Sequence, residues 1–177
     1  MDKTALRKAI REQKRAMSVP EIEEKSRLLT EKFLATAAYR DARTIYGYLP
    51  YNQEVRTGEI LAQALLDGKR VAVPKCYGDE MRFIYLEDLS QVEKGYCGIP
   101  EPIADGPEGD DPTALVLMPG MAFDPQGHRI GYGGGFYDKF LAAEPDHPTL
   151  ALCYDFQMLP LLETEEFDIP VDTVIWA

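Results

Sequence analysis

The sequence predicts a three-layer α/β/α domain built around a mostly parallel sheet. Short, continuously apolar segments such as 71–73 and 114–118 alternate with helical segments, which is the pattern of a parallel sheet covered on both faces. The chain has 177 residues, and domains of about 100–200 residues are usual. Hydrophobic residues make up 45% of it, enough for a core of its own. We therefore expect a single domain over residues 1–177.

Two helices are expected at the start of the chain. Asp2 or Thr4 can cap a helix over residues 3–17, because both side chains accept hydrogen bonds from first-turn amides. Residues 18–21 read Ser-Val-Pro-Glu, a capping box with proline near the first helical position. A second helix should therefore begin there and run to about residue 37.

The rest of the chain alternates between strands and helices. Pro50 and Pro74 each end a predicted strand, because proline lacks the N–H group that a ladder needs. Thr57 is a candidate helix cap and Gly68 a signal for a helix C-terminus. Strands are expected at 44–49, 70–73, 81–86, 114–118, 149–153 and 173–176, helices at 57–66 and 136–143, and loops at 95–113 and 127–135.

Composition and charge limit the classes of partner. Lys and Arg total 19 against 30 Asp and Glu, so the net charge is −11, and nucleic acid, which binds clustered positive charge, is not expected. No apolar run approaches the ~18–20 residues of a membrane span. The cysteines Cys76, Cys97 and Cys153 have neither the count nor the spacing of a disulfide framework or zinc site. The first residues hold no apolar stretch typical of a signal peptide, so we expect a cytoplasmic protein.

The stretch from Met118 to Lys139 has the strongest functional signal. Its glycine-rich turn at 131–135 follows a buried strand and leads into a helix, and ligands of open α/β sheets bind at the carboxyl ends of strands. Backbone N–H groups and a helix N-terminus suit phosphate, and Arg129 can add a full charge. The turn has neither the P-loop nor the dinucleotide-binding spacing. By itself it indicates an anion-binding loop or an ordinary flexible turn.

Four further charged residues are candidates with two interpretations each. Asp138 is a possible Mg²⁺ ligand beside the loop, or an acid favoured by the helix N-terminus. Lys3 and Arg7 lie one helical turn apart and form either a polyphosphate patch or a solvated helix face. Glu54 follows the first strand and either accepts hydrogen bonds from the amines of a heterocycle or is a surface acid.

The stretch 118–139 resembles the signature of the 5-formyltetrahydrofolate cyclo-ligase family. It holds, in order, Pro-Gly, Ala-Phe-Asp, Gly-His-Arg-Ile-Gly, the glycine turn and Phe-Tyr-Asp. The N-terminal Lys3-x-x-x-Arg7 helix, the segment 49–55 and the motif at 98–102 are similar to the family too. The resemblance covers nearly the whole chain, and a signature of this length is far more specific than a lone glycine loop.

This resemblance implies a fold related to the sugar-phosphate isomerases and CoA transferases. Apart from the resemblance, we expect a soluble protein that is a monomer. The resemblance also implies a reaction, the ATP- and Mg²⁺-dependent cyclisation of 5-formyltetrahydrofolate to 5,10-methenyltetrahydrofolate, with release of ADP and phosphate. The formyl oxygen takes the γ-phosphoryl group, N10 attacks the activated carbon, and phosphate leaves. Small molecules are thus the expected partners.

The resemblance also implies a role for individual residues. Arg129, Tyr137 and Asp138 are the expected catalytic residues. Mg²⁺ is expected at Asp138 and Asp172, and the folate at Leu49, Glu54 and Tyr137. Some relatives have basic residues in the glycine turn where this chain has Tyr132 and Gly134. ATP is expected at Lys3, Arg7, Arg129, Gly131, Tyr132, Gly133, Gly134, Gly135, Phe136, Tyr137 and Asp138.

Two other functions remain as alternatives. The first is a folate- or nucleotide-binding protein without turnover, which the intact Arg129, Asp138 and Glu54 disfavour. The second is an enzyme of the same fold that acts on sugar phosphates or CoA thioesters. The Lys3/Arg7 helix and the full signature at 118–139 disfavour it.

Overall fold

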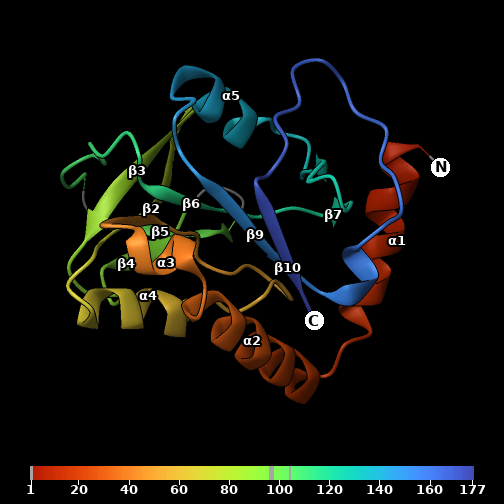
Figure 1. The fold of residues 1–177 in the computed structure, drawn as a ribbon, viewed down its shortest axis with the longest axis horizontal. Helices are drawn as coiled ribbons and strands as arrows, with labels where there is room; N and C mark the ends of the chain where they lie inside the picture. Colours follow the sequence, from red (N-terminus) through yellow and green to blue (C-terminus); the bar gives the residue numbers. More distant parts are fainter. Residues whose placement is uncertain (1, 96–97, 104) are drawn as a thin grey trace.

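A six-stranded, mostly parallel sheet forms the centre of the protein (Figure 1). The computed structural model describes residues 2–95, 98–103 and 105–177. The strand order is β10-β9-β6-β1-β2-β3; β3 pairs antiparallel with β2, and the other neighbours pair in parallel. The predicted fold class is confirmed. The strands are β1 (Thr44–Tyr46), β2 (Arg70–Tyr77), β3 (Glu80–Leu86), β6 (Leu115–Met118), β9 (Thr149–Cys153) and β10 (Thr173–Trp176).

Helices cover both faces of this sheet (Figure 1). One face packs against α2 (Val19–Leu34), α3 (Ala37–Asp41) and α4 (Gly58–Leu66), which bury residues such as Phe33 against Ile45. The opposite face packs against α5 (Phe136–Ala143) through a second core cluster. Consecutive strand residues point to opposite faces, so the fully apolar strands supply both clusters.

The first helix lies beside the sheet rather than on either face. In α1 (Lys3–Arg15), Ile10 is buried against Met121 and Ile130, around a small hairpin of β7 (Ala122–Phe123) and β8 (Arg129–Ile130). This third cluster holds α1 against the segment that leads into the glycine turn. The remaining elements are β4 (Val92–Lys94), β5 (Pro100–Pro102) and the 3₁₀ turn η2 (Asp155–Gln157).

Several helix signals act as predicted. Asp2 accepts a hydrogen bond from the amide of Ala5 at 2.7 Å and caps α1. The capping box at the start of α2 is present, and Gly68 follows α4 with a φ of 80°. The second helix ends at Leu34 rather than near 37, because Thr36 accepts a hydrogen bond from the amide of Tyr39 and begins a separate helix.

Three predictions about punctuating residues are wrong. The strand expected to end at Pro50 is shorter, because the last residue of β1 is Tyr46. Pro74 does not end β2, which continues to Tyr77. The pairing of β2 with β1 ends at Ala72, so beyond that point β2 has β3 as its described neighbour and the missing N–H is tolerated. Thr57 does not cap α4 through its side chain, because its hydroxyl donates to the carbonyl of Tyr48.

Some predictions concern residues outside or beside these elements. Cys76 is half-buried in β2 and Cys153 is buried in β9, whereas Cys97 lies outside the described residues. The predicted loop 95–113 contains the short strand β5. Within the described part of the chain, none of the helices has the length and apolar character that a membrane span requires.

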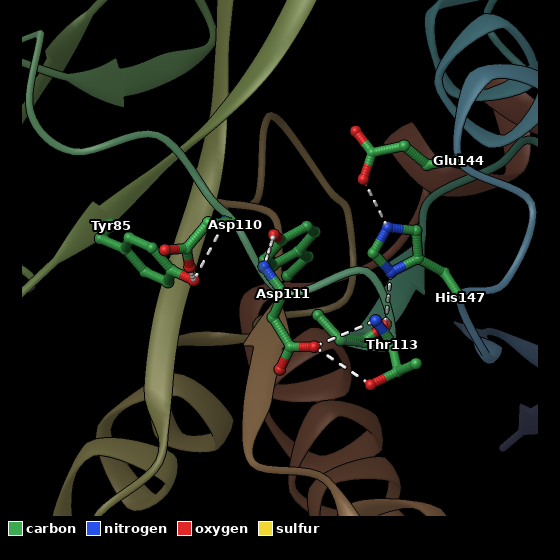
Figure 2. A network of polar contacts seen from close by, with 8 residues as sticks. Tyr85, Asp110, Asp111, Thr113, Glu144 and His147 are labelled. Atoms are coloured by element: carbon green, nitrogen blue, oxygen red, sulfur yellow. Dashed lines mark hydrogen bonds and ion pairs between the residues drawn. The ribbon is translucent and has the colours of Figure 1, made fainter.

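A network of hydrogen bonds lies at the amino ends of β6 and β9 (Figure 2). His147 is buried between the carbonyl of Ala114 and the carboxylate of Glu144, at 2.8 and 3.0 Å. The hydroxyl of Tyr85 donates to Asp110 at 2.6 Å. These contacts tie the loop before β6 to its neighbours at the edge opposite the carboxyl ends of the strands.

Asp124 fixes the turn between β7 and β8 and yields a stability prediction. Its side chain is fully buried and accepts from the amides of Gln126, His128 and Leu162, all at 3.0 Å, with His128 Nδ1 at 2.8 Å. Burial acts to raise the pKa of Asp124, but the hydrogen bonds from Leu162 and His128 outweigh it and lower the pKa below its ordinary value. Asp124→Asn should therefore reduce the free energy of unfolding by about 2–4 kcal/mol at neutral pH.

Chemical denaturation of the variant and the wild type checks this value, with Asp79→Asn, on the exposed turn between β2 and β3, as the control. A lowered carboxyl pKa stabilises the fold above the ordinary pKa, and the contribution is lost as the pH falls through the lowered value. The difference between wild type and Asp124→Asn should therefore shrink in acid. A difference that stays constant down to the lowest pH would contradict this account.

Candidate active site

The candidate site lies beyond the carboxyl end of β6. The chain leaves β6 at Met118, forms the β7–β8 hairpin and then the glycine turn at 131–135, and enters α5. This is the edge at which open α/β sheets bind ligands. The segment 49–55, which follows β1, and the helix α1 both contact the same turn, as described below.

The glycine turn presents backbone amides without a covering side chain. Gly133 and Gly135 have φ values of 110° and 70°, a region that favours glycine. Gly135 is the N-cap of α5 and has no side chain with which to cap it. The first amides of a helix have no intrahelical partner, so this N-terminus suits an anion.

Arg129 provides a buried positive charge beside this turn. Its side chain is 6% exposed, Nη1 donates to the carbonyl of Pro119 at 3.1 Å, and Nη2 lies 3.4 Å from Asp138 Oδ2. The Nε–H group is buried and has no hydrogen-bond partner among the described residues. A buried donor without a partner is costly, so this guanidinium fits an anionic ligand that would complete its hydrogen bonds.

The two predicted metal ligands have different surroundings. Asp138, in the first turn of α5, also accepts from the amide of Ile169 at 3.4 Å. Asp172 precedes β10 and accepts from the amide of Thr149 at 2.9 Å. No described contact joins the two carboxylates, and the described residues contain no cluster of three or more metal-ligating side chains. Asp138 fits an ion carried by phosphates, because Mg²⁺ usually takes one or two carboxylates together with phosphate oxygens.

The structure separates the two basic residues of α1 that were predicted to bind ATP. Arg7 Nε donates to the carbonyl of Gly131 at 2.8 Å, so it contacts the glycine turn directly. Lys3 Nζ lies 3.7 Å from both Glu165 and Asp168 and is partly exposed. Arg7 thus holds the turn, whereas Lys3 faces an acidic loop at the rim.

Glu54 is anchored at both carboxylate oxygens. Oε1 accepts from the amide of Tyr51 at 2.8 Å, and Oε2 accepts from the hydroxyl of Tyr132 at 2.7 Å. Burial raises the pKa of Glu54, while the Tyr132 hydrogen bond and the nearby Lys14 act to lower it. Leu49, the other predicted folate contact on this segment, packs partly buried against the core beside α2 and α4.

Tyr137 interacts with both Arg129 and Glu54. The centre of its ring is 5.9 Å from the Arg129 guanidinium. Its pKa is raised, chiefly by burial and then by the charge of Glu54, while Arg129 acts to lower it. The phenol is therefore protonated and can donate a hydrogen bond. The neighbouring Phe136 packs partly buried in the cluster beneath α5, and a Cβ at Gly134 would come within 2.9 Å of its ring.

One residue of this site was missed from the sequence. Lys14 is only 6% exposed, and its ammonium group donates to the hydroxyl of Tyr132 at 3.4 Å. Its helical spacing from Arg7 places both residues on one face of α1. That spacing was the available signal, but it does not distinguish a buried lysine from a solvated one.

Comparisons with known proteins find relatives along the whole chain. The profile of the 5-formyltetrahydrofolate cyclo-ligase family matches residues 1–177. A mouse protein named 5-formyltetrahydrofolate cyclo-ligase is 29% identical over 98% of this chain and 93% of its own length. The protein of that name from Escherichia coli K12 is 28% identical over 94% of this chain and 95% of its own length.

Solved structures give the same result. A 5,10-methenyltetrahydrofolate synthetase from Aquifex aeolicus superimposes with a TM-score of 0.86 at 26% identity, covering 99% of this chain and 90% of that one. Its counterpart from Mycoplasma pneumoniae gives 0.79 at 25% identity, covering 99% and 98%. The resemblance found in the sequence is therefore confirmed. Since the match extends over every residue of the chain, the protein belongs to the 5-formyltetrahydrofolate cyclo-ligase family.

Proposed function

We propose that the protein catalyses the ATP- and Mg²⁺-dependent cyclisation of 5-formyltetrahydrofolate to 5,10-methenyltetrahydrofolate, with release of ADP and phosphate. One observation carries this proposal. Arg129 has a buried Nε donor without a described partner, and Glu54 is a carboxylate anchored at both oxygens. Both charges act on the protonated phenol of Tyr137, whose ring centre lies 5.9 Å from the Arg129 guanidinium. An anion site and a polar heterocycle site therefore meet at one hydrogen-bond donor.

The nucleotide half of the site acts by positioning and charge neutralisation. The amides of the glycine turn and the guanidinium of Arg129 bind the polyphosphate, and Arg7 keeps the turn in place through Gly131. Phosphoryl transfer from ATP to the formyl oxygen needs little covalent help from a protein. Mg²⁺ held through Asp138, with Asp172 as the second predicted ligand, would neutralise charge on the phosphates.

The folate half of the site orients the acceptor. Glu54 has lone pairs left for the amine groups of the pterin, and Leu49 supplies apolar contact. Tyr137 donates a hydrogen bond to the formyl oxygen and then to the phosphate that forms on it. N10 attacks the activated carbon, the C–O bond breaks, and phosphate leaves with the former formyl oxygen. The sequence-based expectation of a cytoplasmic monomer remains part of this proposal.

Absorbance during incubation with 5-formyltetrahydrofolate, ATP and Mg²⁺ tests the activity. We expect the methenyl-folate band to grow only when both ATP and the metal ion are present. Binding of folate or ATP in calorimetry without any growth of the band would favour the non-catalytic binding protein. A complete lack of binding of either ligand would contradict the proposal altogether.

Glu54→Gln should weaken folate binding more than ATP binding. The amide keeps the size of the side chain but loses the charge that receives the pterin amines, so we expect the KM for 5-formyltetrahydrofolate to rise about 10-fold. Steady-state kinetics with each substrate varied in turn measure both constants. Glu59→Gln, on the exposed first turn of α4, is the matched control. A change in the KM for ATP alone would remove Glu54 from the folate site.

A further inference from the structure

The buried ammonium group of Lys14 has no part in the reaction as described above. Lysine is rarely buried in proteins unless it is paired. In this chain Lys14 is 6% exposed, and its Nζ lies 3.4 Å from the hydroxyl oxygen of Tyr132 and 5.7 Å from the centre of that ring. The phenol of Tyr132 thus replaces part of the hydration shell of this cation.

The hydroxyl of Tyr132 connects Lys14 with Glu54, the residue proposed to bind the folate. Its hydroxyl accepts from Lys14 and donates to Glu54 Oε2 at 2.7 Å, while 47% of the residue is exposed. Lys14 and Tyr132 are separated by 118 positions in the chain, and Tyr132 and Glu54 by 78. One phenol oxygen therefore joins α1, the glycine turn and the segment after β1.

Two further hydrogen bonds hold the elements that carry Lys14, Tyr132 and Glu54 in place. Arg7 donates to the carbonyl of Gly131, so α1 holds two consecutive residues of the turn. The amide of Tyr51 holds the other oxygen of Glu54. A carboxylate bound at both oxygens has one orientation, and its remaining lone pairs point in set directions.

The charges of Lys14 and Glu54, at the two ends of this series of hydrogen bonds, each favour the ionised form of the other. Burial lowers the pKa of Lys14, and the charge of Glu54 acts to raise it; Arg11 acts to lower it further. Burial raises the pKa of Glu54, and Lys14 acts to lower it. The phenols of Tyr48, Tyr137 and Tyr154, which also face Glu54, have raised pKa values and stay neutral. Lys14 is therefore the cation that favours the ionised form of Glu54.

We propose that Lys14 is a positioning residue, which acts through Tyr132 to hold the carboxylate of Glu54 ionised and oriented for the folate. This inference rests on the proposed function. It gives Tyr132 a role on the folate side as well as the predicted role in ATP binding. It also explains why a phenol stands in the glycine turn, because a shorter side chain would not reach from α1 to Glu54.

Steady-state kinetics of Lys14→Met and Tyr132→Phe test this inference. Each variant removes one link, so the KM for 5-formyltetrahydrofolate should rise about 10-fold. The kcat and the KM for ATP should change less than about twofold in Lys14→Met. In the double variant the KM for 5-formyltetrahydrofolate should be little higher than in either single variant, because both changes interrupt the same series of hydrogen bonds. Lys14→Arg should recover most of the affinity, since a guanidinium also donates to a phenol.

Two controls match the chemistry of the changes. Lys8→Met removes a cation from the exposed face of the same helix. Tyr85→Phe removes a phenol that donates to a carboxylate, Asp110, at the opposite edge of the sheet (Figure 2). We expect wild-type constants for both.

The pH profile distinguishes positioning from a purely structural role. In Lys14→Met the acidic limb of kcat/KM for the folate should move to higher pH, because Glu54 has lost the charge that favours its ionised form. An unchanged limb, an unchanged KM, or an equal rise in both KM values would overturn the inference while the wild type still turns over. If the wild type does not cyclise the folate, calorimetric binding of 5-formyltetrahydrofolate to wild type and Lys14→Met decides, and equal affinity or no binding overturns the inference.

Discussion

Arg129→Met should slow methenyl-folate formation by about 100- to 1000-fold, the loss typical of removing one preorganised donor from a charge-stabilising site. The side chain of Arg129 is 6% exposed, and its guanidinium contacts both Asp138 and the carbonyl of Pro119. Its Nε–H group, which has no partner in the described part of the chain, should bind the phosphates. No other described basic side chain combines this burial with contact to Asp138.

A second variant separates charge from geometry. Arg129→Lys keeps a cation of similar length but loses the planar fork, so it should recover only part of the rate. Single-turnover kinetics of both variants measure the effect on the chemical step. Arg70→Met is the control, because Arg70 is an exposed arginine paired with Asp110 at 3.0 Å. A rate within twofold of wild type in folded Arg129→Met would show that Arg129 does not bind the transferred group.

Asp138→Asn should lower kcat by about 100-fold while leaving the fold nearly intact. The amide oxygen can still accept from the amide of Ile169, but it has lost the charge that attracts Mg²⁺. The side chain of Asp138 is 23% exposed, but that of its ion-pair partner Arg129, 3.4 Å away, is only 6% exposed. The free energy of unfolding should therefore fall by about 1–3 kcal/mol, between the values for an exposed and a buried pair.

Turnover measured against Mg²⁺ concentration checks this role, with chemical denaturation measured in parallel. The variant should need more Mg²⁺ for half of its maximal rate. Lys139→Met, at the exposed next position of α5, controls for a change in local charge. Full activity at the wild-type Mg²⁺ requirement would remove Asp138 from the metal site.

The sequence predicts an element well where a local signal and burial agree. The helix Phe136–Ala143 and the strands Thr149–Cys153 and Thr173–Trp176 have the predicted bounds, because turn residues lie next to strongly apolar runs. Pro74 was misinterpreted because its effect depends on which strands lie beside it. Which strands lie beside β2 depends on the strand order of the sheet, and a local stretch of sequence does not specify that order.

The same limit applies to the site. Arg129 and Asp138 are nine positions apart and their ion pair joins two ends of one motif, so the sequence could associate them. The contact of Tyr132 with Glu54 spans 78 positions, and no pattern pairs them. Lys14 has the spacing of an exposed basic face on α1, and only its burial against the glycine turn separates it from its solvated neighbours.

Oxygen tracing tests most directly whether this site couples ATP cleavage to ring closure. The protein is incubated with ATP, Mg²⁺ and 5-formyltetrahydrofolate that carries ¹⁸O in the formyl group, and the released phosphate is analysed by mass spectrometry. We expect one labelled phosphate for each methenyl-folate formed, because the formyl oxygen accepts the γ-phosphoryl group and leaves with it. Unlabelled phosphate, or methenyl-folate formed without ADP, would contradict the proposed mechanism.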